Sequence, residues 1–279
     1  MMIFAMLTWG LSWTNAKILG QYADAPLIMT WRFFFASISF APLLKFSQTS
    51  FRLNKKASLF ILFNALSMVS YNYFYFKGTQ IGLAGTGGVL VITLNPILTA
   101  LFASLIFGNK LLKKDWIGLV LGLLGGAVII RLWEIDLESL MQSGNLYFIL
   151  ASLSWVSVTI ITSRSKDSVS FMSYSFWSFT LACLLSIPFS INDNLFIIFD
   201  FDKIFWANLF MLSVMAMSFG TTVYFLASVK LGPKKASSFI FTVPLTAMGF
   251  AMYFLGEPLQ LSTLIGGLLG IIAFYLINK

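Results

Sequence analysis

The chain has 279 residues, of which 58% are hydrophobic and only 10% are charged. Soluble domains carry about 25% charged residues, so this composition excludes a water-soluble fold. A single cysteine excludes a disulfide framework. The sequence has no histidine, and we expect neither a metal ion nor a cofactor.

Ten apolar stretches follow one another along the chain, each long enough for a helix that crosses a bilayer core of about 30 Å. The connections between them are too short for a soluble domain. We therefore predict one all-α integral membrane domain. The predicted spans are residues 2–21, 27–45, 57–77, 83–107, 115–132, 145–163, 170–190, 205–229, 236–255 and 260–277.

The charged residues divide between alternate connections. The set that includes both termini holds 13 of the 18 basic residues, and the other set holds eight of the ten acids. Basic residues collect on the cytoplasmic side of a membrane protein. We therefore predict a multi-pass protein of the cytoplasmic (inner) membrane with both termini in the cytoplasm. The formal net charge of +8 then faces anionic lipid and not nucleic acid.

The two halves of the chain are related by an internal repeat. Tryptophan, proline and glycine pairs recur in the same order at a nearly constant separation: Trp9 and Trp155, Trp31 and Trp177, Pro42 and Pro188, Pro96 and Pro244, Gly108 and Gly256, Gly118 and Gly266, Gly122 and Gly270. Each repeat holds five spans, an odd number, so the second must be inverted in the membrane. We expect repeats at 1–133 and 145–279, joined by an extracytoplasmic linker at 134–144.

Several motifs resemble the EamA-like family of the drug/metabolite transporter superfamily. They are Leu7-Thr8-Trp9-Gly10, Trp31-Arg32-Phe33, the run from Pro96 to Phe107-Gly108-Asn109-Lys110-Leu111, and Gly256-Glu257-Pro258-Leu259. The resemblance covers essentially the whole chain. It implies ten helices in two inverted five-helix repeats and the export or exchange of small metabolites, often amino acids. The acidic position of the last motif is Asn109 in the first repeat, so we give it no coupling role.

Polar and aromatic side chains inside the spans predict the substrate path. Lipid offers no hydrogen-bond partner, so polar groups turn toward one another or toward a wet cavity. In the alternative interpretation, Ser and Thr hydroxyls only bind backbone carbonyls or join helices, and the tryptophans only pack. The predicted substrate-binding residues are Trp9, Ser12, Asn15, Arg32, Tyr71, Tyr75, Asn95, Trp155, Thr221 and Thr242.

Arg32 is the basic residue that lies well inside a span, and its repeat counterpart is Ser178. Placing an arginine near the bilayer centre costs about 2.5–3.5 kcal/mol on insertion scales. A bidentate bond to a substrate carboxylate would offset that cost and fix the orientation of the substrate. The alternative is that Arg32 extends toward the interface, or binds Asp24 or a loop carbonyl.

Pro96 and Pro244 occupy matching positions inside the fourth and ninth predicted spans. Proline lacks an N–H group and frees a carbonyl one turn earlier, which protein or cavity water must then satisfy. Paired interruptions of this kind mark the binding site in inverted-repeat transporters. A simple kink for packing is the alternative.

Small residues form a stripe on each of the spans that end the two repeats. Such stripes let two helix backbones approach closely. They predict either packing inside the chain or a homodimer contact. The residues are Gly118, Gly122 and Gly126 in the fifth span, and Gly266 and Gly270 in the tenth.

We predict a transporter that moves a small organic metabolite, an amino acid or a similar zwitterion, by alternating access. An intramembrane enzyme is the less favoured alternative, because no acid lies deep in a span and histidine is absent. A channel would need a filter or a charged ring, and the sequence has neither.

Facilitated or exchange-driven transport is favoured over proton coupling, because all ten acids map to connections or helix ends. Gly256-Glu257-Pro258 predicts a turn that opens the last span. Pro258 would take the first helical position, with the Glu257 carboxylate at that helix N-terminus. A proton-coupled drug or metabolite exporter is the alternative.

Overall fold

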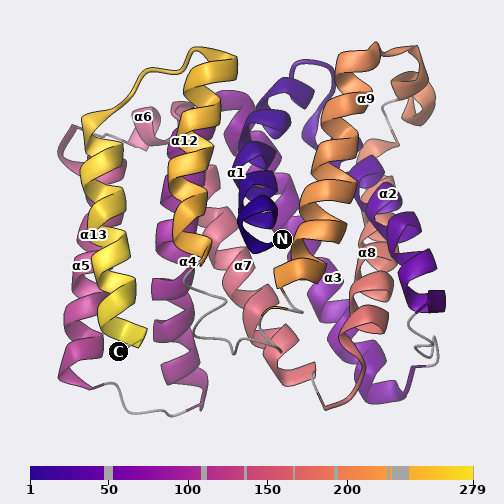
Figure 1. The fold of residues 1–279 in the computed structure, drawn as a ribbon, viewed down its shortest axis with the longest axis horizontal. Coiled ribbons are helices and arrows are strands. Elements are labelled where there is room, and N and C mark those ends of the chain that lie inside the picture. The colour runs from indigo at the N-terminus through magenta and orange to yellow at the C-terminus, as the bar shows by residue number, and fades with distance from the viewer. Residues whose placement is uncertain are drawn as a thin grey trace.

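The structure is a computed structural model that describes residues 1–46, 53–107, 112–134, 137–165, 167–191, 194–224, 227 and 239–278. Within these ranges the regular elements are all helices, and no strand is present. Figure 1 shows the helices side by side, with consecutive long helices running in opposite directions. The predicted all-α fold is confirmed.

A described helix lies in each of the ten predicted ranges, and short helices occupy some connections. The elements are α1 (Met2–Leu19), α2 (Ala25–Phe46), α3 (Lys55–Ile81), α4 (Ala84–Phe107), α5 (Lys113–Ile129), η1 (Leu132–Glu134), α6 (Leu137–Gln142), α7 (Asn145–Ser165), α8 (Phe171–Ser186), η2 (Ile187–Ser190), η3 (Leu195–Asp200), α9 (Lys203–Phe210), the π-helical η4 (Met211–Gly220), η5 (Phe239–Phe241), α12 (Thr242–Leu255) and α13 (Leu261–Asn278).

Five helical segments of the described chain are long and apolar enough to cross a membrane: Lys55–Ile81, Ala84–Ile106, Asn145–Ser165, Phe171–Ser190 and Lys203–Tyr224. Two shorter apolar helices, Thr242–Leu255 and Leu261–Leu276, accompany them. Many large apolar side chains on these helices are exposed on the outside of the bundle, where lipid is their natural solvent.

Helices from the two halves of the chain pack on one another. The closest pairs are α5 with α13, α3 with α7, α2 with α8, and α1 with α12. In Figure 1, α1 and α12 lie near the middle, α5 and α13 at one side, and α2 and α8 at the other. Every one of these pairs joins an early helix to a late one, so the halves interlock instead of forming separate bundles.

The glycine stripes of α5 and α13 pack against other helices of the same chain. A Cβ placed on Gly125 would lie 2.7 Å from the Gly266 carbonyl oxygen, and one on Gly126 would lie 2.9 Å from Leu94 of α4. Gly270 likewise faces Thr93 of α4. These glycines therefore let α5, α13 and α4 approach closely, which agrees with the packing interpretation.

The charged connections lie at opposite ends of the bundle. The connections at the end that we call the inner end follow α2, α4 and α7 and border Lys55, Lys113 and Arg164. The connections after α1, α3, α5, α8 and α12 lie at the outer end. Seven basic residues predicted for the inner end lie outside the described residues: Arg52, Lys110, Lys166, Lys230, Lys234, Lys235 and Lys279.

The turn before α13 differs from the prediction. The helix begins at Leu261, so Pro258 precedes it and does not occupy its first position. The Glu257 carboxylate accepts hydrogen bonds from the Ala84 and Gly85 N–H groups at the start of α4. Glu257 therefore caps a helix from the other half of the chain. The corresponding motif of the first repeat, at Asn109, lies outside the described residues.

Candidate substrate-binding site

Arg32 is buried in the bundle, with 7% of its surface exposed. Its Nη1 donates a hydrogen bond of 2.7 Å to Oδ1 of Asn72 on α3. The Asn72 side chain is fixed in turn, because its Nδ2 donates to the Met68 carbonyl at 2.8 Å. The guanidinium carbon lies 5.3 Å from the ring centre of Tyr75 and 5.7 Å from that of Phe76. These distances are typical of a cation–π contact.

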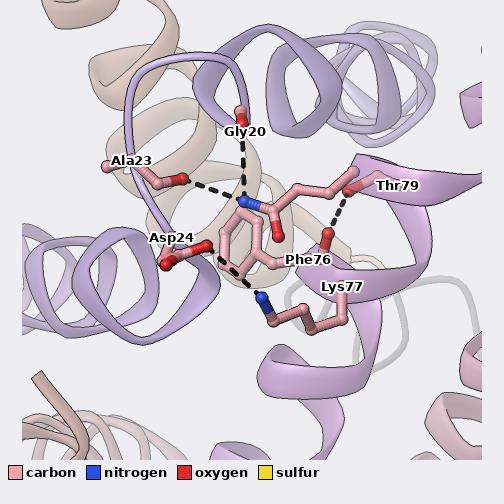
Figure 2. Close-up of polar contacts among 7 residues, drawn as sticks. Gly20, Ala23, Asp24, Phe76, Lys77 and Thr79 are labelled. Carbon is pink, nitrogen blue, oxygen red and sulfur yellow. Dashed lines mark hydrogen bonds and ion pairs between the residues drawn. The ribbon is translucent and has the colours of Figure 1, made fainter.

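The alternative partners of Arg32 are excluded. Asp24 accepts from Lys77 Nζ at 3.3 Å, as Figure 2 shows, and the burial of Arg32 rules out extension to the interface. Arg32 Nε is buried and has no hydrogen-bond partner among the described residues. Among the described residues, no carboxylate lies within ion-pair distance of the guanidinium. Arg32 is therefore a buried charge without a described counter-charge, an arrangement that favours an anionic ligand.

Tyr75 connects Arg32 to α1. Its hydroxyl donates to the Ser12 carbonyl at 2.6 Å, and the Ser12 hydroxyl donates to the Trp9 carbonyl, also at 2.6 Å. Tyr71, one turn earlier on α3, has its ring centre 5.8 Å from that of Tyr75. The structure thus brings α2 and α3 together at the guanidinium, with α1 joined to Tyr75 through the Ser12 carbonyl.

Trp155 adds α7 to the same region. Its ring centre lies 4.8 Å from that of Tyr71. We use the name Arg32 cluster for the group of residues linked by these contacts, in which Ser12 takes part through its backbone carbonyl: Ser12, Arg32, Tyr71, Asn72, Tyr75 and Trp155. Five of its members were predicted from the sequence.

Trp9 faces a different helix. Its indole N–H donates to the Ala216 carbonyl of η4 at 2.9 Å, and its ring centre lies 5.4 Å from that of Tyr224. Trp9 and Trp155 therefore lie against different helices and do not line one common surface. The first packs on the segment α9–η4, and its repeat counterpart packs on α3.

The remaining predicted residues have no described hydrogen bond or ring contact to the Arg32 cluster. Asn15 is 4% exposed. In the described part of the chain, neither its Nδ2 nor Oδ1 of Asn95 in α4 has a hydrogen-bond partner. Thr221 is partly buried just after η4. Thr242 is exposed, and its hydroxyl donates to the Phe239 carbonyl, as the backbone-binding interpretation expects.

The two prolines are not equivalent. Pro96 lies in the interior of α4, as predicted. Pro244 is the third residue of α12 and therefore sits in its first turn, where an α-helix leaves its N–H groups unpaired. Pro244 thus does not interrupt α12, and the prediction of matching breaks is wrong for this residue.

Sequence reasoning missed Asn72, Trp13 and Phe148. The ring centre of Trp13 lies 4.7 Å from that of Tyr75 and 5.9 Å from that of Phe148. Phe148 is fully buried and separates this region from the outer end. Asn72 is a polar residue inside a span, so the rule that selected Tyr71 could have found it. No sequence signal marked Phe148.

Two side chains of α3, Gln80 and Lys77, hold the turn between α1 and α2 at the outer end. The Gln80 side-chain amide donates to the Ala23 carbonyl at 2.9 Å and to the Gly20 carbonyl at 3.4 Å. Lys77 binds Asp24 beside them (Figure 2). The outer ends of the first three helices therefore form one connected unit.

A cavity of about 380 Å³ opens near the outer end, lined by ends of α3, α4, α5 and α7. Its polar lining includes Arg131, Glu134 and Gln260, and none of the predicted site residues borders it. Arg32 and Tyr75 lie six or seven residues from the outer ends of their helices, a depth of about 10 Å at about 1.5 Å per residue. The Arg32 cluster is thus buried beneath the outer end.

The helical bundle agrees with the comparison to known families. Residues 1–131 and 142–279 match the model of the EamA-like transporter family. The chain belongs to the EamA-like transporter family. Membership makes it a multi-pass membrane protein of a family of transporters with small-molecule substrates, as the resemblance of its motifs implied.

Three named relatives are similar in sequence to this chain over 63–100% of its length. An uncharacterized transporter of Bacillus subtilis, YvbV, is 24% identical over 100% of this chain and 90% of its own length. A second, YoaV, is 22% identical over 96% of this chain and 91% of its own length. The S-adenosylmethionine uptake transporter of Rickettsia bellii is 24% identical over 63% of this chain and 59% of its own length.

The crystal structure of another protein superposes on this chain with a TM-score of 0.65. It covers 98% of this chain and 94% of the other at 16% identity. At that identity the likeness concerns the fold alone.

Proposed function

We propose that this EamA-like protein transports a small organic metabolite with a carboxylate group, an amino acid or a similar zwitterion, by alternating access. The observation that carries the proposal is the burial of Arg32 without a described counter-charge. An ionised side chain inside a membrane bundle marks a functional site by default, because its burial is costly. A ligand carboxylate would supply the missing charge.

The geometry around Arg32 suits a zwitterion. Asn72 uses one guanidinium donor, and Nε is free for a second acceptor. A planar fork binds a carboxylate in a bidentate manner, which also fixes its orientation. The adjoining faces of Tyr71 and Trp155 would accommodate a substrate ammonium group through cation–π attraction.

We further propose that the ten helical ranges are membrane spans in two inverted repeats, at 1–133 and 145–279. Two observations support this: the family model matches in two segments, and the helix contacts come in related pairs. Exchanging the repeats converts the contact of α3 with α7 into that of α1 with η4. It also converts α4 with α7 into α1 with α12, and α2 with η4 into α3 with α8.

We place the protein in the cytoplasmic (inner) membrane. Its inner end faces the cytoplasm, and the linker at 134–144 lies on the extracytoplasmic side. The basic residues of the inner end support this orientation. A homodimer would use the outer faces of α5 and α13, because their glycines are covered within the chain.

We propose facilitated or exchange-driven transport. The Arg32 cluster contains no acid, and the described acids lie at helix ends or in connections. The Rickettsia relative named for S-adenosylmethionine uptake makes that compound a further substrate to test, since it also carries an amino acid carboxylate.

Counterflow in proteoliposomes tests the proposal. Labelled amino acids and S-adenosylmethionine would be offered to the purified protein, after a screen for ligands that raise its thermal stability. Loss of a charge-assisted hydrogen bond costs about 1.5–3 kcal/mol, so Arg32→Lys should lower counterflow by about ten- to a hundredfold. Arg164→Lys, at the inner end, is the matched control.

Equal counterflow by Arg32→Ala and the parent would remove Arg32 from substrate binding. Flux that neither saturates nor exchanges would indicate a channel and contradict alternating access. A substrate without an anionic group would refute the proposed chemical class.

A further inference from the structure

Glu257 joins the two halves of the chain at the outer end. Its carboxylate oxygens accept hydrogen bonds from the Ala84 N–H at 2.7 Å and the Gly85 N–H at 2.9 Å. These donors start α4, where no partner within the helix exists and the helix dipole favours a negative charge. One side chain therefore satisfies two backbone groups that lie more than 170 residues earlier in the sequence.

The surrounding turn aims Glu257 at α4. Gly256 has a φ of +65°, which L side chains rarely adopt, and the Glu257 N–H donates back to the Ala251 carbonyl at 3.3 Å. This closes the end of α12 and directs the next side chain across to α4. The position of the carboxylate thus follows from the backbone and not from a flexible loop.

Lys17 of α1 reaches the same place. Its Nζ donates to the Gly82 carbonyl at 2.6 Å and to the Gln80 carbonyl at 3.3 Å, directly before α4. Lys17 thus binds the backbone two residues before Ala84, which Glu257 binds. The ends of α1, α3, α4 and α12 therefore meet at one polar junction.

The junction lies above the Arg32 cluster. Phe148 and Trp13 fill the space between them, and Trp13 contacts Tyr75 of the cluster. Below Glu257, α4 and α12 are in close contact: a Cβ on Gly88 would lie 2.6 Å from that of Ala247. Trp13 lies between Gly88 and Tyr75, so a separation of α4 from α12 would loosen the packing beside the Arg32 cluster.

We propose that Glu257 is the latch of an outer gate, and that its release from α4 opens the Arg32 cluster to the extracytoplasmic side. The inference deepens the proposed function and rests on it for the alternating-access cycle. Glu257 is a positioning residue that touches no substrate. At the outer end, water can replace each partner when the bonds break, so the latch is reversible.

Cysteine accessibility tests the latch without any knowledge of the substrate. The reporter is Ser12→Cys in a Cys183→Ser background, labelled in intact cells with an impermeant maleimide. Asn194→Cys serves as the exposed outer control. Because water replaces the partners of both hydrogen bonds at the outer end, their loss should raise the labelling rate of the reporter by about ten- to a hundredfold in Glu257→Ala. Glu257→Gln keeps one acceptor and should give a smaller rise.

Glu138→Ala is the matched control, because this exposed outer carboxylate bonds only to Gln142 among the described residues; it should leave the rate unchanged. An unchanged rate in folded Glu257→Ala would overturn the latch and leave Glu257 as a helix cap. If Glu257→Ala does not fold, Glu257→Gln takes its place: a raised labelling rate supports the latch, and an unchanged rate overturns it.

A disulfide across the same contact gives a second test. An ideal Cβ on Gly85 lies 3.3 Å from the Cβ of Ala251, close to the separation of about 3.5–4.5 Å found in disulfides. Gly85→Cys with Ala251→Cys should cross-link on oxidation and stop counterflow, and a reductant should restore it. Continued counterflow in the oxidised protein would refute the gate.

The tests separate the two proposals. A rise in reporter labelling without counterflow of any carboxylate substrate would support the gate and refute the proposed substrate class. Carboxylate counterflow that depends on Arg32 but survives the cross-link would support the function and refute the gate.

Discussion

The Phe148 ring packs against three glycines, Gly78, Gly82 and Gly87. Replacing one of them by a larger residue should destabilise the outer part of the bundle. A Cβ on Gly87 would lie 2.5 Å from the ring Cζ, and one on Gly78 would lie 2.6 Å from Cε1. Carbon atoms in contact normally stay about 3.5–4.0 Å apart. Gly87→Ala therefore forces an overlap that the fully buried ring has little room to relieve.

Two opposing effects set the size of this change. Replacing a helical glycine by alanine gains up to about 1 kcal/mol from helix propensity. Overpacking a close-packed core costs about 1–3 kcal/mol. Because the new Cβ is fixed to the backbone and meets a buried ring, we expect a clash in the upper part of this range, about 2–3 kcal/mol, and hence a net loss of about 1–2 kcal/mol for Gly87→Ala.

A second substitution should rescue the first. Phe148→Leu removes the ring atoms that the new Cβ meets, at a cavity cost of about 1–2 kcal/mol. The double variant should then be about as stable as Phe148→Leu alone, which corresponds to an interaction energy of about 1–2 kcal/mol. Gly249→Ala on α12 is the control, since a Cβ there meets nothing within 4 Å.

Unfolding of the purified protein in mixed micelles, followed by tryptophan fluorescence during a denaturing-detergent titration, measures all four variants. The reasoning fails if the two single costs simply add in the double variant. It also fails if Gly87→Ala is as harmless as Gly249→Ala, because the slot around Phe148 would then be open.

Three further predictions concern pH, orientation and coupling. Hydrogen bonds from the Phe205 N–H, the Tyr22 hydroxyl and the Ile204 N–H lower the pKa of Asp202, the N-cap of α9. The stability that the ionised Asp202 contributes should be complete above the ordinary aspartate pKa and should be lost as pH falls through the lowered pKa. The unfolding midpoint of the parent should therefore exceed that of Asp202→Asn near neutral pH, and the two midpoints should converge only in acid. A cysteine at Asn194 should react with an impermeant maleimide in intact cells before one at Ser50, which lies outside the described residues; the reverse order would invert the topology. A pH gradient with the potential clamped should not drive accumulation, whereas uphill uptake that Glu257→Gln abolishes would establish proton coupling.

Helix positions were predictable because hydropathy and length carry that information. The predicted range 83–107 corresponds to α4 at Ala84–Phe107. The π-helical form of Met211–Gly220 could not be predicted, because an apolar run has the same composition in either helix type. Its geometry depends on tertiary contacts such as the bond from Trp9 to the Ala216 carbonyl, and π-helical turns often accompany functional sites.

The Arg32 cluster was partly predictable. A lone arginine in a span is visible in the sequence, and so is the spacing of Tyr71 and Tyr75. The choice of Asn72 as the partner of Arg32 depends on how α3 is rotated toward α2. Likewise, the Glu257 carboxylate was recognisable as a helix cap, but its helix is remote in sequence. Pairings between distant elements are set by packing, which local patterns do not encode.

The proposed repeats combine a symmetric scaffold with asymmetric chemistry. Trp9 packs on η4 and Trp155 packs on α3, so these counterparts contact equivalent helices. Arg32 has Ser178 as its counterpart, a buried hydroxyl without a partner in the described chain. Related helix contacts allow two conformations of similar energy, which alternating access requires. The proposed zwitterionic substrate has no such symmetry, so a residue that only one repeat contains would bind its charged groups.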